Sequence, residues 1–137
     1  MKLTEIVVQP AVTPALKSTE RNGVLGEMVD SLVASGELSA DIRDEIVAKL
    51  LDREEKGSTG FGRGVAVPHA KHPAVKRLIA AVGLSERGVD FASLDKQPVF
   101  SIFLLLSPKD QPEEHLQAME VIFKNLSKEN FRRFLRQ

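Results

Sequence analysis

Residues 99–106 have the sequence VFSIFLLL, which is apolar at every position except Ser101. A second apolar run covers Leu78–Leu84. Strands that are apolar at successive positions are typical of a sheet covered on both faces. Both runs are far shorter than the roughly 20 residues of a membrane span. We therefore interpret them as central strands of a covered sheet.

Apolar residues recur at helical spacing on both sides of these two runs. One helix is predicted over Val24–Val33, with Ser18 or Thr19 as its N-cap and Gly36 as its end, and a second from Ser39 to Gly57. Further predicted elements are strands at Ile6–Val8 and Val65–Val67, a turn at Ser85–Gly88, a helix that has Pro112 in its first turn and the stripe Leu116, Met119, Ile122, Phe123 and Leu126, and a short helix from Phe131, Phe134 and Leu135.

The order of these elements is not a strict alternation of strands and helices. It predicts an α/β fold in which a mixed central β-sheet is flanked by helices on both faces. The chain has 137 residues, and at roughly 150 residues per domain we expect a single domain over residues 1–137.

Composition excludes several classes of function. Lys and Arg together number 19, as do Asp and Glu, and there is no Trp or Tyr, which argues against a nucleic-acid-binding protein. The absence of cysteine rules out disulfides, thiol catalysis and thiolate zinc sites. The first residues lack the apolar stretch of a secretory signal. We expect a soluble, cytoplasmic protein with no direct insertion into a membrane.

The segment Ser58-Thr59-Gly60-Phe61-Gly62-Arg63-Gly64 is expected to be a loop, because glycine favours neither helices nor strands. Such a loop can direct successive N–H groups at an anion. The strand that follows ends at Pro68 and His69, where the imidazole can act as a base, a ligand or a nucleophile. The alternative is a flexible turn followed by a surface histidine. The glycine spacing fits neither a P-loop nor a dinucleotide-binding loop.

Two further histidines and one arginine have competing interpretations. His72 is expected in an exposed loop, and His115 is either a helix-surface residue or part of a site. The three histidines together are weak evidence for a metal site. Arg53 is either at a solvated helix end or folded back onto the glycine segment.

Arg53-Glu54-Glu55 together with Ser58–His69 resembles the active-site signature of fructose/mannitol-type enzyme IIA domains of the bacterial phosphotransferase system. The nitrogen-regulatory IIA proteins belong to the same family. Weaker matches extend the resemblance over almost the whole chain: Gly88-Val89-Asp90-Phe91, Asp95, Pro98-Val99, Leu104–Pro108 and His115-Leu116.

The resemblance implies a phosphotransferase that works without metal or cofactor. In this family the histidine of the Pro-His pair is the nucleophile, which is His69 here. It accepts a phosphoryl group from the histidine phosphocarrier protein, and then passes it to a IIB domain or keeps it as a regulatory mark for a target protein. Arg53 and His115 are expected to face the phosphoryl group. Further phosphate contacts are expected from Thr59, Gly60, Gly62, Arg63 and Gly64.

Some positions depart from the family pattern. Arg63 stands where the family often has Asn or an acidic residue, and Ala70 where Gly is common. The family's domain is usually somewhat longer at its C-terminus, so a shortened form is expected. The sequence favours the nitrogen-regulatory branch. The alternatives are a fructose/mannitol-specific IIA component, a non-catalytic interaction module like the cytoplasmic domain of anion exchangers, and a metal-dependent hydrolase.

Overall fold

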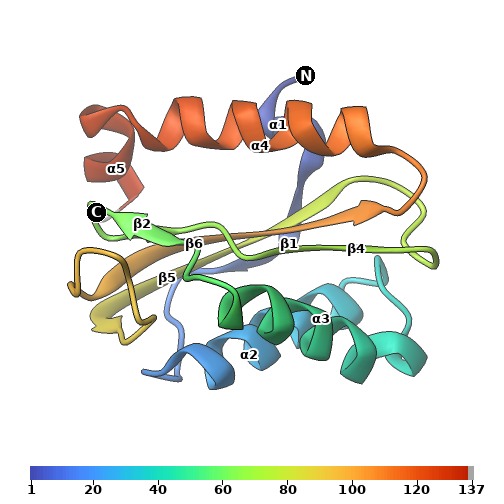
Figure 1. Ribbon diagram of the computed structural model, residues 1–137, viewed down its shortest axis with the longest axis horizontal. Coiled ribbons are helices and arrows are strands. Elements are labelled where there is room, and N and C mark those ends of the chain that lie inside the picture. Colours follow the sequence, from blue (N-terminus) through green and yellow to red (C-terminus); the bar gives the residue numbers. More distant parts are fainter. Residues whose placement is uncertain (136–137) are drawn as a thin grey trace.

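The computed structural model describes residues 1–135 of the chain. Its elements, in chain order, are α1 (Leu3–Ile6), β1 (Val7–Thr13), α2 (Arg21–Ala34), the 3-10 helix η1 (Ala40–Ile42), α3 (Arg43–Glu55), β2 (Gly60–Gly62), β3 (Val65–Ala66), β4 (His69–His72), β5 (Ile79–Val89), β6 (Val99–Pro108), α4 (Pro112–Leu126) and α5 (Glu129–Leu135). Helices α2 and α3 cover one face of the sheet, and α1, α4 and α5 cover the other (Figure 1).

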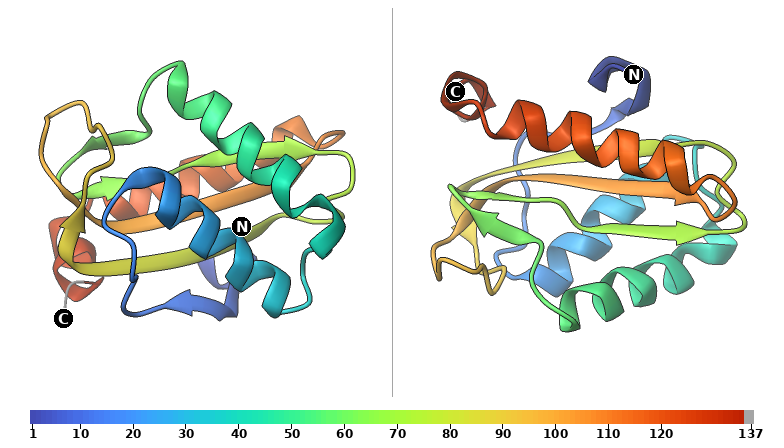
Figure 2. Two further views of the ribbon diagram at one scale, coloured as in Figure 1. Left: turned by 90° about the horizontal axis from the view of Figure 1, so that it is seen from below. Right: turned by 45° about the horizontal axis from the view of Figure 1, so that its top comes forward.

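The sheet is mixed, as the sequence predicts. Five of its six strands follow the order β1-β5-β6-β3-β2. The sixth, β4, also pairs with β6, closer to the C-terminal end of that strand than β3 does. The β5–β6 and β2–β3 pairs are antiparallel, whereas β1–β5, β3–β6 and β4–β6 are parallel. Strand β4 therefore lies at an edge of the sheet, between α3 on one face and α4 on the other (Figures 1 and 2).

Strand β6 confirms the interpretation of its apolar sequence. Side chains alternate along a strand, and Ile102, Leu104 and Leu106 pack in the core beneath α2 and α3. Phe103 and Leu105 pack in the second core beneath α4. Each successive side chain is thus buried on one face or the other, which explains the nearly unbroken apolar run.

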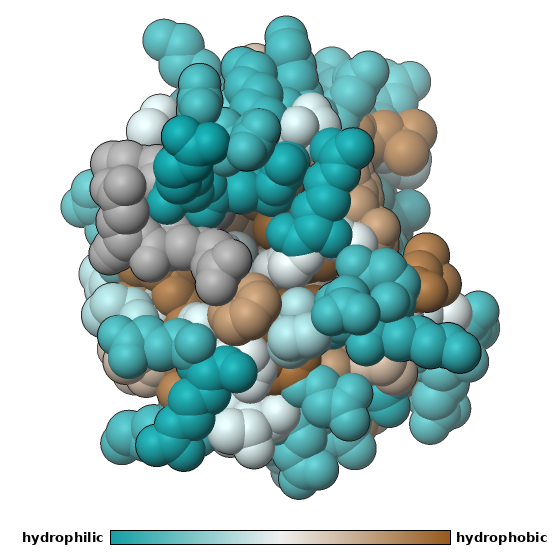
Figure 3. Space-filling view, turned by 90° about the vertical axis from the view of Figure 1, so that its left-hand side faces the viewer, coloured by the Kyte–Doolittle hydropathy of each residue, from teal (hydrophilic) through white to brown (hydrophobic). Residues whose placement is uncertain are grey.

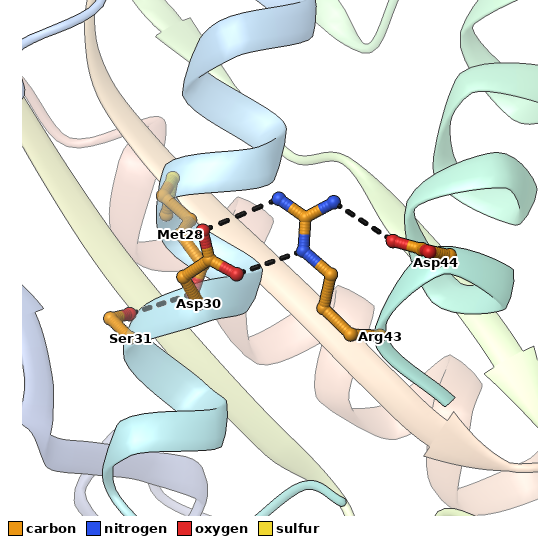
Figure 4. A network of polar contacts seen from close by, with 5 residues as sticks. All are labelled: Met28, Asp30, Ser31, Arg43 and Asp44. Carbon is orange, nitrogen blue, oxygen red and sulfur yellow. Dashed lines mark hydrogen bonds and ion pairs between the residues drawn. The ribbon is translucent and has the colours of Figure 1, made fainter. Parts of the chain in front are cut away.

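An arginine links α2 to α3 (Figure 4). The Arg43 guanidinium donates to both Asp30 carboxylate oxygens at 2.8 and 3.3 Å, and to Asp44 at 3.2 Å. Asp30 and Asp44 raise the pKa of Arg43 through these bonds, against the opposing effect of burial. Gly26 on α2 provides the room, because a Cβ there would lie 2.9 Å from an Arg43 nitrogen.

The ends of the first two helices differ in part from prediction. Ser39 does accept a hydrogen bond from Asp41 N, but it caps the 3-10 helix rather than α3. Neither Ser18 nor Thr19 caps α2, whose N-cap is Glu20 with no side-chain bond. The segment before α2 is held instead by Glu27, whose carboxylate accepts the N–H groups of Lys17 and Ser18. Gly36 follows the end of α2 at φ +84°, as expected of a terminating glycine.

Three predictions about the strands are wrong. Gly60–Gly62 forms strand β2, because it pairs with β3 and tertiary pairing outweighs propensity. Ser85–Gly88 does not reverse the chain: it lies within β5, where the register shifts between Leu84 and Val89. The residues after Pro68 form β4 rather than a loop, because they pair with the end of β6.

Helix α4 begins at Pro112 as predicted, but its buried stripe is shifted. The buried residues are His115, Ala118, Ile122 and Leu126, whereas Leu116 is 67% exposed and Phe123 is also exposed. Helix α5 is present as expected, and the side chains of Phe134 and Leu135 lie outside the described residues. Within residues 1–135, no helix combines the length and apolar composition needed to cross a bilayer.

The side of the molecule shown in Figure 3 is mostly hydrophilic, with hydrophobic residues in small groups between polar ones. Small exposed apolar groups of this kind are ordinary on a globular surface and require no partner. The candidate site must therefore be identified from its chemistry rather than from an apolar patch on this side.

Candidate functional site

A cleft of about 380 Å³ lies where α3, β4 and α4 meet. Its walls carry four basic side chains and one acidic side chain, so the cleft favours an anion. The residues that line it are Lys49, Asp52, Arg53, Lys56, His69, Ala70, Lys71 and His115. Three residues predicted for the site, Arg53, His69 and His115, are thus brought together from separate elements.

His69 is the first residue of β4 and is half-buried. Its Nδ1 lies 2.9 Å from the carbonyl oxygen of Val67. A carbonyl oxygen only accepts, so Nδ1 carries a proton and donates it. In the neutral ring the lone pair is then on Nε2. Burial lowers the pKa of His69, and the positive charge of Arg53 adds to this, while the bond to Val67 opposes it.

His115 lies in the first turn of α4 and is only 6% exposed. The helix-surface alternative is therefore wrong. Its ring centroid lies 5.6 Å from that of His69, with the planes tilted by 54°. Its Nδ1 lies 2.6 Å from Ser107 Oγ at the end of β6. Burial, followed by the charges of His69 and Lys71, lowers the pKa of His115 to about 4. His115 is thus neutral at pH 7.

Arg53 is in the last turn of α3, and one of its guanidinium nitrogens donates to Gly57 O at 2.7 Å. This contact holds the side chain beside the start of the glycine segment while it lines the cleft with His69. The residue therefore folds back, as the functional interpretation of the sequence required. Basic side chains are also favourable at a helix C-terminus.

Glu54 has a position that the sequence did not indicate. It is 3% exposed, and its carboxylate accepts the backbone N–H of Thr59 at 3.0 Å and also the Thr59 hydroxyl. Thr59 O accepts the N–H of Val67 at 3.2 Å. A chain of hydrogen bonds thus runs from Glu54 through Thr59 and Val67 to the ring of His69.

Five residues of the glycine segment were expected to bind phosphate: Thr59, Gly60, Gly62, Arg63 and Gly64. None of them is among the described residues that line the cleft. Gly62, Arg63 and Gly64 make the tight turn between β2 and β3, all at positive φ (+113°, +60° and +77°). The N–H of Thr59 is bonded to Glu54, and that of Gly60 to the Ser58 hydroxyl. Their contact with phosphate stays a prediction.

The prediction that His72 is an exposed loop residue is wrong. It lies in β4, is 7% exposed, and its Nε2 is 2.8 Å from a Glu45 carboxylate oxygen. Its Nδ1 accepts the N–H of Ala74. An odd separation of three residues along a strand puts His69 and His72 on opposite faces. No cluster of three potential metal-binding side chains occurs within residues 1–135.

No sequence motif singled out the other charged residues of the cleft. Lys49, Arg53 and Lys56 follow each other at intervals of four and three residues, which places them on one face of α3 and its C-cap. Lys71 is two residues from His69 and so shares its face of β4. Spacing alone could have grouped these residues, once β4 was identified as a strand.

Comparisons with known proteins show the family and the fold of the chain. Residues 6–137 match the family described as "Phosphoenolpyruvate-dependent sugar phosphotransferase system, EIIA 2". The nitrogen regulatory protein of Bradyrhizobium diazoefficiens is 34% identical over 99% of this chain and 87% of its own length. The fructose-specific EIIABC component of Bacillus subtilis is 35% identical over 98% of this chain, which spans only 21% of that protein.

A solved structure gives the same result. The crystal structure of nitrogen regulatory protein IIA-Ntr from Neisseria meningitidis superposes with a TM-score of 0.87 at 29% identity, covering 97% of this chain and 89% of that one. The family of the chain follows from the match over residues 6–137, and the relatives and the shared fold agree with it. It belongs to the EIIA 2 family of the phosphoenolpyruvate-dependent sugar phosphotransferase system.

Proposed function

We propose that this chain is a phosphocarrier in which His69 accepts a phosphoryl group from the phosphohistidine of the histidine phosphocarrier protein. Domains of its family take part in phosphoryl transfer in general. The observation that carries the finer proposal is the bond between His69 Nδ1 and Val67 O. It leaves Nε2 as the nucleophilic nitrogen of a ring that lines a cationic cleft.

The transfer is a displacement at phosphorus. The Nε2 lone pair of His69 forms the new N–P bond, while the N–P bond of the donor breaks and its electron pair returns to the donor nitrogen. Nδ1 keeps its proton, so the phosphorylated ring carries positive charge next to the Val67 carbonyl oxygen. Phosphoryl transfer of this kind depends mainly on positioning and charge stabilisation.

Arg53 and His115 are the side chains that we assign to the phosphoryl oxygens. Arg53 provides a permanent cation with planar donors that suit phosphate. His115 provides a neutral imidazole next to His69. Lys49, Lys56 and Lys71 add positive charge around the same cleft. The backbone N–H groups of Thr59 and Gly60 contribute only after release from Glu54 and from the Ser58 hydroxyl.

The phosphoryl group then acts as a regulatory mark or passes to a IIB domain, and we propose that this relay operates in the cytoplasm. Similarity to the nitrogen regulatory proteins supports the regulatory role. Similarity to the fructose-specific component supports relay to a IIB domain in sugar uptake. The retention of Arg53, His69 and His115 around one cleft argues against a pure interaction module.

The test is intact mass after incubation with phosphoenolpyruvate, enzyme I and the histidine phosphocarrier protein. One acid-labile phosphoryl adduct is expected on the wild-type chain and none on His69→Ala. An adduct that persists on His69→Ala would overturn the assignment of the nucleophile. No adduct on the wild type would favour the interaction module.

A second step separates the two proposed uses. Purified phosphorylated chain is mixed with a fructose-type IIB domain, and loss of the adduct is followed over time. Rapid loss supports the sugar-uptake alternative, whereas a persistent adduct supports the regulatory mark.

A further inference from the structure

Ser107 makes a buried contact with His115 that links the end of β6 to the first turn of α4. Its side chain is fully buried, and its Oγ lies 2.6 Å from His115 Nδ1. The register of β4 against β6 pairs His69 with Leu105 and Lys71 with Ser107. Ser107 therefore lies on the same face of the sheet as His69, and its contact with His115 places it directly behind that ring.

The direction of this hydrogen bond follows from the chemistry of the two groups. A neutral imidazole has one N–H and one bare nitrogen, and His115 is neutral because its pKa lies at about 4. A buried hydroxyl must donate to an acceptor, since leaving its proton unpaired is costly. Within residues 1–135, His115 Nδ1 is the acceptor that lies within hydrogen-bond distance of Ser107 Oγ, at 2.6 Å.

We infer that Ser107 is a positioning residue, which donates to Nδ1 of His115 and so fixes the ring proton on Nε2. With Nδ1 occupied by Ser107, the ring edge that remains for the cleft carries the Nε2–H donor. His69 has the opposite arrangement, because Val67 holds its Nδ1–H and leaves Nε2 bare. The two rings thus present complementary nitrogens, one nucleophile and one donor for a phosphoryl oxygen. This inference rests on the proposed function.

The experiment compares three variants with the wild type. Ser107→Ala removes the hydroxyl with little change in volume, and Ser107→Thr restores it. Ser101→Ala is the matched control, because Ser101 is also a buried serine of β6 on the same face. Ser107→Cys, with its weaker donor, replaces Ser107→Thr if the added methyl prevents folding. Near-native amide spectra are required of every variant before it is used.

Two quantities are measured, and the first needs no phosphoryl donor. Imidazole ¹⁵N chemical shifts of His115 at neutral pH are expected to show a bare Nδ1 and a protonated Nε2 in the wild type and in Ser101→Ala. In Ser107→Ala the proton should be shared between both nitrogens. The transfer rate at saturating donor should fall about five- to tenfold in Ser107→Ala, while KM for the donor stays unchanged.

The outcomes separate this inference from the proposed function. A wild-type His115 with its proton on Nδ1 overturns the inference, as does a Ser107→Ala variant with wild-type tautomer and rate. A rate that falls equally in Ser101→Ala overturns it too, because the loss then comes from the strand and not from the contact. If the wild type accepts no phosphoryl group, the proposed function and the contribution of Ser107 to transfer both fail, while the ¹⁵N shifts still decide the direction of the bond between Ser107 and His115.

Discussion

The buried carboxylate of Glu54 accepts both the backbone N–H and the hydroxyl of Thr59. This pair joins the end of α3 to the start of β2 and closes the intervening segment against the sheet. Thr59 O in turn holds Val67, whose carbonyl oxygen accepts the Nδ1–H of His69. Val67, which orients the proposed nucleophile His69, is therefore anchored through Thr59 by Glu54. Glu54 follows the cleft residue Arg53 in the sequence.

Replacing the threonine tests this anchor. Thr59→Val keeps the backbone N–H but removes the hydroxyl, leaving one oxygen of a buried carboxylate unpaired. We expect it to lower the free energy of unfolding by about 1–3 kcal/mol. Thr59→Ser keeps both bonds and should remain within about 1 kcal/mol of wild type. Urea unfolding of the three proteins measures both values, and equal midpoints for Val and Ser would contradict the prediction.

The sequence predicted the centre of the fold better than its edge. Strand β6 is buried on both faces and α2 is buried along one stripe, and the order of apolar residues in the sequence reveals both patterns. Strand β4 was missed because its pairing with β6 depends on a partner more than thirty residues away. Gly60–Gly62 and Ser85–Gly88 were assigned from local propensity, and in both segments strand pairing proved stronger.

The same limit applies to the site. The signature around His69 made this residue the candidate nucleophile, and the His-Leu pair made His115 a further candidate. Sequence could not show that Ser107 lies behind His115, nor that Glu54 binds Thr59, because both contacts arise from the packing of separate elements. His115 itself belongs to the buried stripe of α4, and treating it as polar shifted the predicted stripe.

Arg53 is expected to affect transfer more than stability. The residue is half-buried and its guanidinium donates to the carbonyl oxygen of the exposed Gly57, so Arg53→Ala should cost no more than about 1 kcal/mol of unfolding free energy. The rate of phosphoryl acceptance should fall at least about tenfold, since the guanidinium that we assign to the phosphoryl oxygens is lost. Arg87→Ala removes an exposed arginine of β5 and is the matched control. An unchanged rate in Arg53→Ala would count against its place in the site.

His72 and His69 should show opposite effects. His72→Ala removes the acceptor for the Ala74 N–H and the contact with Glu45, and is expected to lower stability by about 1–3 kcal/mol. Its transfer rate should stay within about twofold of wild type, because the side chain lies on the other face of β4. His69→Ala should abolish transfer. Urea unfolding and the mass assay separate them, and loss of transfer in a folded His72→Ala variant would refute the distinction.

The pKa of His115 predicts how stability depends on pH. Its folded value of about 4 lies below the ordinary value of 6.5, so the unfolded chain binds more protons between these two values. The contribution of neutral His115 to the free energy of unfolding is therefore complete above about pH 6.5 and declines as the pH falls towards 4. In His115→Gln this part of the decline should be missing. Urea unfolding at several pH values across the window measures the difference between the two proteins. His69, whose pKa is also lowered, is present in both and contributes to both curves. Parallel curves for the two proteins would mean that His115 is not held neutral by the fold.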